Sequence, residues 1–304
     1  MSPIGVLLMA YGGPNNLEQV EPYLLDVRGG RPTSPQIVHE VCERYRRIGG
    51  RSPILERTQA QAAAIQSALN DSRFHVRAGM RHWHPYIKDV LMQMADEGIA
   101  RAVGLAMAPH YSRMSIGAYY NKVEEANAPI EMERIERWHL LPGYLDALAE
   151  RVREALAKFP AEVRAEVPIV FTAHSLPKRI LEWNDPYPSE LQATVAELME
   201  RLGPHPCEFA FQSAAISAEP WLGPDAGEII RRLADQGRRH ILIAPIGFVV
   251  EHVEILYDVD IVYKQQADQL GVHLERIEML DTAPVMIAGL ANLVRSTAKE
   301  KGWL

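Results

Sequence analysis

Cysteine is scarce in this sequence, which has 304 residues and only two thiols, Cys42 and Cys207. Two cysteines cannot build a disulfide framework, and by themselves they are too few for a four-thiolate iron–sulfur or metal centre. Isolated thiols are typical of proteins in a reducing compartment. The sequence therefore predicts a cytoplasmic protein without a disulfide framework.

Positive charge and long hydrophobic runs are also lacking. Lysine and arginine number 32 against 39 aspartates and glutamates, which gives a formal net charge of −7. Nucleic-acid-binding proteins need a basic surface, so this balance argues against that class. The longest apolar run, 241–250, is far shorter than the roughly 20 residues of a membrane-spanning helix. We expect no nucleic-acid partner and no integral membrane segment.

Several motifs of common enzyme classes are absent. The chain has no H-E-x-x-H or paired C-x-x-C zinc pattern, no G-x-x-x-x-G-K-[ST] phosphate loop and no G-x-S-x-G nucleophile elbow. These absences argue against a tight zinc site, nucleotide hydrolysis and the chemistry of α/β-hydrolases.

Short apolar runs alternate with segments of helical periodicity. Several runs are apolar throughout, as in parallel strands that are covered on both faces. Landmarks repeat in the second half, where 168–177 resembles 6–14 and 239–252 resembles 101–112. The sequence thus predicts an α/β fold of two similar lobes joined within 140–165, with ligands in a cleft at the carboxyl ends of the strands. The expected strands are 4–10, 74–79, 101–107, 168–173, 207–212 and 240–246.

Acidic residues and a histidine in the second half could carry chemistry. His174 directly follows a predicted strand, a position that suits a functional histidine or a half-buried histidine that caps the sheet. If the segment after Phe248 is helical, Glu254 and Asp258 lie one turn apart, with Glu251 near the same stripe. Such like charges repel each other. They form either a solvated acidic face or a path for a hard cation or for protons.

A second group of polar residues lies in the first half. Tyr11 ends the first predicted strand, and the two glycines after it allow close approach of a ligand, although a core tyrosine before a simple turn would look the same. Arginines gather within 28–51, among them Arg28 and Arg44, close to Tyr45 and Ser52. Guanidinium groups suit carboxylate or phosphate binding, and solvated arginines on a surface helix are the alternative.

Together and in order, these motifs resemble the ferrochelatase family along nearly the whole chain. The most specific pieces are AHSLP, PWLGP and the HxExxYD pattern at 252–258. The matching segments are AYGGP at 10–14, RYRRIGGRSPI at 44–54, GMRHWHP at 79–85, APHYS at 108–112, AHSLP at 173–177, NDPYP at 184–188, FQS at 211–213, PWLGP at 220–224 and PIGFVVEHVEILYDVD at 245–260.

The resemblance implies an enzyme that inserts Fe²⁺ into a porphyrin in haem biosynthesis. The implied fold is chelatase-like, with two Rossmann-like lobes and a central porphyrin cleft. Residues 1–145 would form the propionate side and 146–304 the metal side, with the last helix packing back toward the first lobe. His174 and Glu254 match the family's catalytic and metal-site pair, and Asp258 matches the next metal-site acid on a π-bulged helix. Which member of the pair accepts protons and which donates metal stays open.

Within the family, the chain is most similar to the enzymes that use coproporphyrin III, whose four propionates call for cationic and hydroxyl partners. His82, which matches a histidine of that group, and Glu251, which stands where the family often has aspartate, are secondary candidates. Protoporphyrin IX is the alternative substrate. A cobalt-type tetrapyrrole chelatase and a non-catalytic haem-binding protein are further alternatives. The residues similar to propionate-binding positions are Tyr11, Arg28, Arg44, Tyr45, Ser52 and Tyr120.

The resemblance also implies the partners. Porphyrin and Fe²⁺ would be substrates, with no tightly bound cofactor. No [2Fe–2S] cluster is expected, because the chain has no cysteine-bearing C-terminal extension like that of some relatives. The product would pass transiently to the next enzyme of the haem pathway.

Overall fold

The structure, a computed structural model, describes residues 2–215 and 219–304. They form two compact units. Unit 1 contains the described residues up to Trp138, together with 250–253 and 281–304. Unit 2 contains the described residues of 139–249, together with 254–280.

The division between the units corrects the predicted boundary between residues 145 and 146. That boundary would cut through helix α6 (Pro142–Leu156), which belongs wholly to unit 2. Tyr144, in the first turn of α6, donates a hydrogen bond of 2.5 Å to the carbonyl of Ile246 in the same unit. The chain therefore enters unit 2 before α6 begins.

Unit 1 is built on a four-stranded parallel sheet. Its strands are β1 (Ile4–Ala10), β2 (Phe74–Met80), β3 (Arg101–Ala106) and β4 (Glu131–Ile135), and its helices are η1 (Leu17–Gln19), α1 (Val20–Val27), α2 (Pro35–Arg47), α3 (Ile54–Leu69), α4 (Ile87–Asp96), α5 (Ile116–Ala126) and α10 (Pro284–Glu300). The strand order is β2-β1-β3-β4. All of β1 is buried, which explains its continuous apolar sequence.

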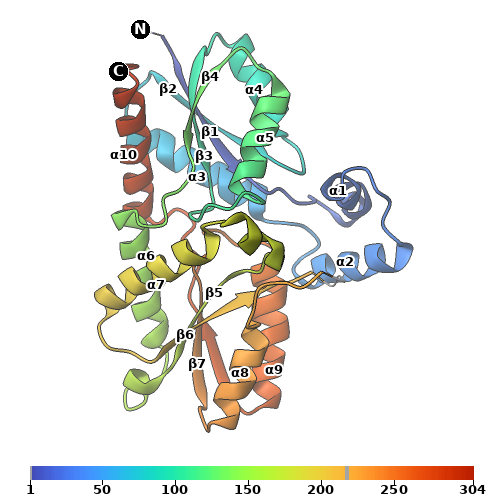
Figure 1. Ribbon diagram of the computed structural model, residues 1–304, viewed down its shortest axis with the longest axis vertical. Coiled ribbons are helices and arrows are strands. Elements are labelled where there is room, and N and C mark those ends of the chain that lie inside the picture. Colours follow the sequence, from blue (N-terminus) through green and yellow to red (C-terminus); the bar gives the residue numbers. More distant parts are fainter. Residues whose placement is uncertain (1, 216–218) are drawn as a thin grey trace. The chain divides into compact units, whose positions relative to one another are not determined.

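Helices cover both faces of the unit 1 sheet, with α4 and α5 on one face and α3 and α10 on the other (Figure 1). The last helix, α10, packs against α3. Arg295 in α10 donates a hydrogen bond of 2.7 Å to the carbonyl of Leu69, at the end of α3. Gln61 in α3 donates one of 2.8 Å to the carbonyl of Asp281, just before α10. The last helix is thus part of the first unit.

Unit 2 repeats the same plan (Figure 1). Its sheet has the order β6-β5-β7-β8, which is the unit 1 order shifted by four strands. This repetition confirms the predicted α/β fold of two similar lobes with parallel sheets. The strands are β5 (Ile169–His174), β6 (Cys207–Gln212), β7 (His240–Pro245) and β8 (His273–Arg276), and the helices are α6, η2 (Arg164–Glu166), η3 (Lys178–Trp183), α7 (Tyr187–Leu202), α8 (Ala226–Asp235), η4 (Glu254–Tyr263) and α9 (Lys264–Gln269).

Two of the strands were missing from the sequence prediction. β4 and β8 each lie at one edge of a sheet. Their sequences, EMERI and HLER, contain more polar than apolar residues. Edge strands have one open side and tolerate polar side chains, so they lack the apolar run that identifies central strands.

Candidate active site

His174 is the last residue of β5, at the carboxyl end of the unit 2 sheet. Its side chain is half-buried. The ring Nδ1–H donates a hydrogen bond to the carbonyl of Ser175, which leaves Nε2 as the nitrogen available for chemistry. The hydroxyl of Tyr187 donates a hydrogen bond of 3.0 Å to the carbonyl of His174 itself. Both the ring and the backbone of His174 are therefore held in place.

Glu254 is the partner of His174. One carboxylate oxygen, Oε1, lies 3.2 Å from Nε2 of His174. Glu254 is the first residue of η4, a ten-residue π-helix. Hydrogen bonds in a π-helix run from residue i to i+5, and such segments occur frequently at functional sites. The structure therefore brings together His174 and Glu254, the pair proposed from the sequence. His174 lies at the end of a strand and Glu254 at the start of a π-helix.

The environment of His174 favours its protonated form. Burial by itself would lower the pKa of the imidazole. The charge of Glu254, its hydrogen bond to the ring, the Ser175 carbonyl and the charge of Asp258 together outweigh burial and raise the pKa to about 8. Because Nδ1 already carries the proton given to Ser175, the additional proton lies on Nε2, facing Glu254.

Asp258 lies further along η4. Its Oδ2 accepts a hydrogen bond of 2.5 Å from the hydroxyl of Ser213. In the described part of the chain, no three histidine, cysteine, aspartate or glutamate side chains form a group that could hold a metal ion. The structure thus shows a pair of donors, His174 and Glu254, and the three-residue metal set that includes Asp258 stays a prediction. Glu251 belongs to the 250–253 segment of unit 1.

Tyr11 and His82 lie together in unit 1, just beyond the ends of β1 and β2. Their ring centres are 4.7 Å apart. The side chain of Tyr11 is 39% exposed, unlike the buried residues of β1 before it. The guanidinium carbon of Arg81 lies 5.8 Å from the centre of the Tyr11 ring. The end of β1 therefore presents a partly exposed tyrosine ring with a cation beside it.

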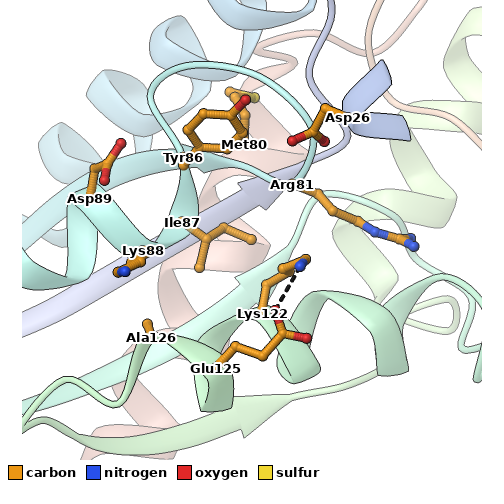
Figure 2. A pocket seen from close by; sticks show the side chains of 10 residues that line it. All are labelled: Asp26, Met80, Arg81, Tyr86, Ile87, Lys88, Asp89, Lys122, Glu125 and Ala126. Carbon is orange, nitrogen blue, oxygen red and sulfur yellow. Dashed lines mark hydrogen bonds and ion pairs between the residues drawn. The ribbon is translucent and has the colours of Figure 1, made fainter. Parts of the chain in front are cut away.

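A pocket of about 200 Å³ in unit 1 is lined by Asp26, Arg81 and Tyr86, among others (Figure 2). Asp26, on its lining, has Oδ1 2.8 Å from Nδ1 of His82. Burial, and after it the charge of Asp26, raises the pKa of the nearby Tyr86 hydroxyl. Burial is the main reason why the pKa of His82 is lowered, and the hydrogen bond that the ring donates to Asp26 opposes that shift. Asp26 therefore holds the Nδ1 edge of the His82 ring.

The other predicted porphyrin contacts differ in their surroundings. Arg28 is exposed at the end of α1, and Arg44 is half-buried in α2. Ser52 is buried and packs so closely on Gly13 that a Cβ there would lie 2.6 Å from the Ser52 Oγ. Tyr45 is also buried, at 2% exposure. Propionate contacts of these four residues stay predictions.

Tyr120 is the most deeply buried of the predicted porphyrin contacts. Its side chain is 1% exposed, in the core between the unit 1 sheet and α5. Its hydroxyl lies 2.8 Å from the carbonyl of Gly104 and 3.0 Å from that of Ile135. Buried hydroxyls are normally satisfied in this way. A propionate contact of Tyr120 stays a prediction, like those of the four residues above.

Comparison with known proteins now identifies the family. The ferrochelatase family model matches residues 3–298. A protein from Herpetosiphon aurantiacus named ferrochelatase is 43% identical over 296 residues, which cover 95% of this chain and 97% of that protein. The chain belongs to the ferrochelatase family. Another relative, from Geobacillus kaustophilus, is named coproporphyrin III ferrochelatase and is 36% identical, covering 98% of this chain and 97% of that protein.

Membership in the family makes this protein an enzyme that inserts a metal into a porphyrin. The fold agrees with that of solved chelatases. SirB from Bacillus subtilis, solved with Fe³⁺, has a TM-score of 0.63 and 11% identity, and the match covers 99% of this chain and 98% of SirB. Among the described helices of this ferrochelatase, none is both long enough and apolar enough to cross a membrane.

Two residues near the candidate sites of this ferrochelatase, Asp26 and Gln212, were not predicted from the sequence. Asp26 is an ordinary acid in a helix until the fold places it against His82. Gln212 lies within the quoted FQS motif, yet a glutamine in a predicted strand signals no role. Both are found only through partners that are distant in the sequence.

We expect Asp26→Asn to lower the pKa of His82 further, because the variant loses the carboxylate whose hydrogen bond and charge oppose the effect of burial. The measurement is an NMR titration of the histidine Cε1–H resonances. Asp89→Asn is the matched control, since Asp89 lines the same pocket but does not contact His82. An unchanged His82 titration in Asp26→Asn would show that the contact is weak in solution.

Proposed function

We propose that this enzyme inserts Fe²⁺ into coproporphyrin III and yields Fe-coproporphyrin for haem biosynthesis. Tyr11 carries the substrate part of the proposal, because it places a partly exposed tyrosine side chain at the end of β1 with the Arg81 cation beside its ring. Arg28 and Arg44 add cations that suit carboxylates. Four propionates use more such partners than the two propionates of protoporphyrin IX do. The name of the Geobacillus kaustophilus relative supports the same choice.

In the proposed reaction, His174 accepts the porphyrin protons one at a time and releases the first to solvent before it takes the second. Two N–H protons must leave the macrocycle as Fe²⁺ enters. The neutral imidazole has its free lone pair on Nε2, because Nδ1–H is occupied by the carbonyl of Ser175. When Nε2 takes a proton, the imidazolium faces the Glu254 carboxylate at 3.2 Å, which stabilises the charge. This assigns the base to His174 and its electrostatic support to Glu254.

Metal delivery falls to the same pair in this proposal. Imidazole nitrogen and carboxylate oxygen are both ligands that suit Fe²⁺. Nε2 of His174 and Oε1 of Glu254 present one of each, and the Asp258 carboxylate adds negative charge nearby. A divalent cation approaching the pair would also favour loss of the proton from Nε2, since the two positive charges repel each other. Iron is therefore handled as a substrate.

The proposal includes no resident cofactor and no [2Fe–2S] cluster. It also includes transient transfer of the product to the next enzyme of the haem pathway. Cofactor-free activity is checked by assaying the purified, chelator-treated protein with only Fe²⁺ and porphyrin added.

The substrate is tested by anaerobic mixing of the protein with Fe²⁺ and either coproporphyrin III or protoporphyrin IX, following the loss of free-porphyrin fluorescence. We expect coproporphyrin III to be metallated faster. Arg44→Ala should raise the KM for coproporphyrin III about tenfold, which corresponds to one lost charge-assisted contact of about 1.5 kcal/mol. Faster reaction with protoporphyrin IX would keep the enzyme class and overturn the substrate.

Arg46→Ala is the matched control for that variant. Arg46 lies on the same helix as Arg44, is exposed, and already pairs with Glu43. Its replacement should leave the KM for either porphyrin unchanged. Equal losses in both variants would mean that overall charge, rather than a specific propionate contact, sets the affinity.

A further inference from the structure

Gln212 is a fully buried polar residue next to the candidate catalytic pair. It is the last residue of β6, its side chain has no exposed surface, and it is registered opposite His174 of β5. Its backbone carbonyl accepts a hydrogen bond of 2.8 Å from the amide of Ser175. A buried amide is costly unless its donors and acceptor are satisfied, so the partners of this side chain indicate what it does.

The Gln212 side chain joins the element of His174 to the element of Glu254. Its Oε1 accepts a hydrogen bond of 2.7 Å from the hydroxyl of Thr172, two residues before His174 in β5. Its Nε2 donates a hydrogen bond of 3.1 Å to the backbone carbonyl of Glu254, at the start of η4. One planar amide therefore spans the gap between β5 and η4.

The orientation of this amide is determined by its partners. The Glu254 carbonyl can only accept a hydrogen bond, so the NH₂ end must face it. The oxygen end then faces Thr172, whose hydroxyl can donate. A flipped amide would place two acceptors against each other at Glu254. The bridge thus has a single satisfied arrangement, as expected of a spacer between two elements.

We propose that Gln212 is a positioning residue for metal insertion, which holds Glu254 at the distance from His174 that the reaction needs. It touches neither reacting atom. It connects the hydroxyl of Thr172, on the strand that carries His174, to the backbone carbonyl of Glu254, and Nε2 of His174 lies 3.2 Å from Oε1 of Glu254. The inference rests on the proposed roles of His174 and Glu254.

The next residue extends the same support to Asp258. Ser213 has φ of +61°, in the left-handed region that non-glycine residues rarely adopt. In this conformation its hydroxyl donates to Oδ2 of Asp258. The Gln212–Ser213 dipeptide thus contacts η4 at two points, the carbonyl of Glu254 and the carboxylate of Asp258.

The decisive variant is Gln212→Met, which keeps the side-chain length and removes the hydrogen bonds to Thr172 and Glu254, together with a longer one to the Ser213 hydroxyl. We expect kcat for metal insertion to fall about 10- to 100-fold, since misplacement of a catalytic group by about 1 Å can cost about 100-fold. The KM for porphyrin should stay within about twofold, because we assign the propionate contacts to unit 1 residues.

Gln266→Met is the matched control. The Gln266 amide also donates to a backbone carbonyl within unit 2, that of Gly227 at 2.9 Å, but it joins α9 to α8. This variant should keep the wild-type kcat. Equal loss of kcat in both variants, or no loss in Gln212→Met, would overturn the positioning role.

A crystal structure of Gln212→Met supplies a readout that does not depend on turnover. We expect Nε2 of His174 and Oε1 of Glu254 to lie beyond hydrogen-bonding distance, and a wild-type separation would overturn the inference. If Gln212→Met does not fold, Thr172→Val removes only the bond to Oε1 and should give the same changes to a smaller extent. Wild-type protein that fails to metallate either porphyrin would instead refute the proposed function, whatever the distance in the variant.

Discussion

His174→Ala is expected to slow metal insertion about 1000-fold, the middle of the range for loss of a general acid or base. The variant loses Nε2, the only ring nitrogen that is free to accept a porphyrin proton, since Nδ1–H is engaged by Ser175. Porphyrin binding should persist, because the residues that we assign to the propionates belong to unit 1. The measurement is anaerobic loss of porphyrin fluorescence, with binding followed separately by the porphyrin absorbance shift.

His205→Ala is the control for that experiment. His205 is a histidine of the same unit whose Nε2 faces the carbonyl of Val167 at 2.7 Å, just before β5 begins. It lies at the opposite end of β5 from His174. Its loss should leave the insertion rate unchanged. Insertion by His174→Ala at the wild-type rate would remove His174 from the mechanism.

Glu254→Gln is expected to reduce the maximal insertion rate about 100-fold and to shift its pH dependence. In the wild type, His174 must lose a proton to act as a base or as a metal ligand, so the rate should rise as the pH increases through about 8. Glu254 is the largest contribution that raises this pKa, while burial lowers it. A neutral glutamine leaves burial dominant, so the rise should move to lower pH. The plateau stays low because the imidazolium has lost its counter-charge.

The pH profile of kcat/KM for the wild type and Glu254→Gln is the measurement. Asp260→Asn is the matched control on the same π-helix, where Asp260 pairs with Arg276 rather than with His174. Its profile should keep the wild-type midpoint. A midpoint that is unchanged in Glu254→Gln, or equally shifted in Asp260→Asn, would show that the charge of Glu254 does not control His174.

Much of the central architecture could be predicted because central parallel strands are continuous apolar runs. β1 and β5 are buried on both faces, and such runs are visible without knowledge of the fold. The end of a run also predicts where a polar side chain meets the edge of the sheet, which is how His174 and Tyr11 were found. The edge strands β4 and β8 and the start of unit 2 before α6 carry no such signal.

The roles of individual polar residues were harder to predict, because burial and partners decide them. Tyr120 matches a substrate position by likeness, yet the fold places its hydroxyl against the carbonyls of Gly104 and Ile135. The reverse holds for Asp26, whose sequence position is unremarkable but whose carboxylate contacts His82. Each partner belongs to another element, so local sequence contains no record of the contact.

By itself, then, the sequence determined the family, the α/β repeat and the nomination of His174 and Glu254, because these depend on motifs and on the periodicity of apolar residues. Only the tertiary structure decided that Nε2 and Oε1 lie 3.2 Å apart, that the pKa of His174 rises to about 8, and that Gln212 bridges their elements. Distances, burial and charge coupling act through space between distant segments, and they exist only once the chain has folded.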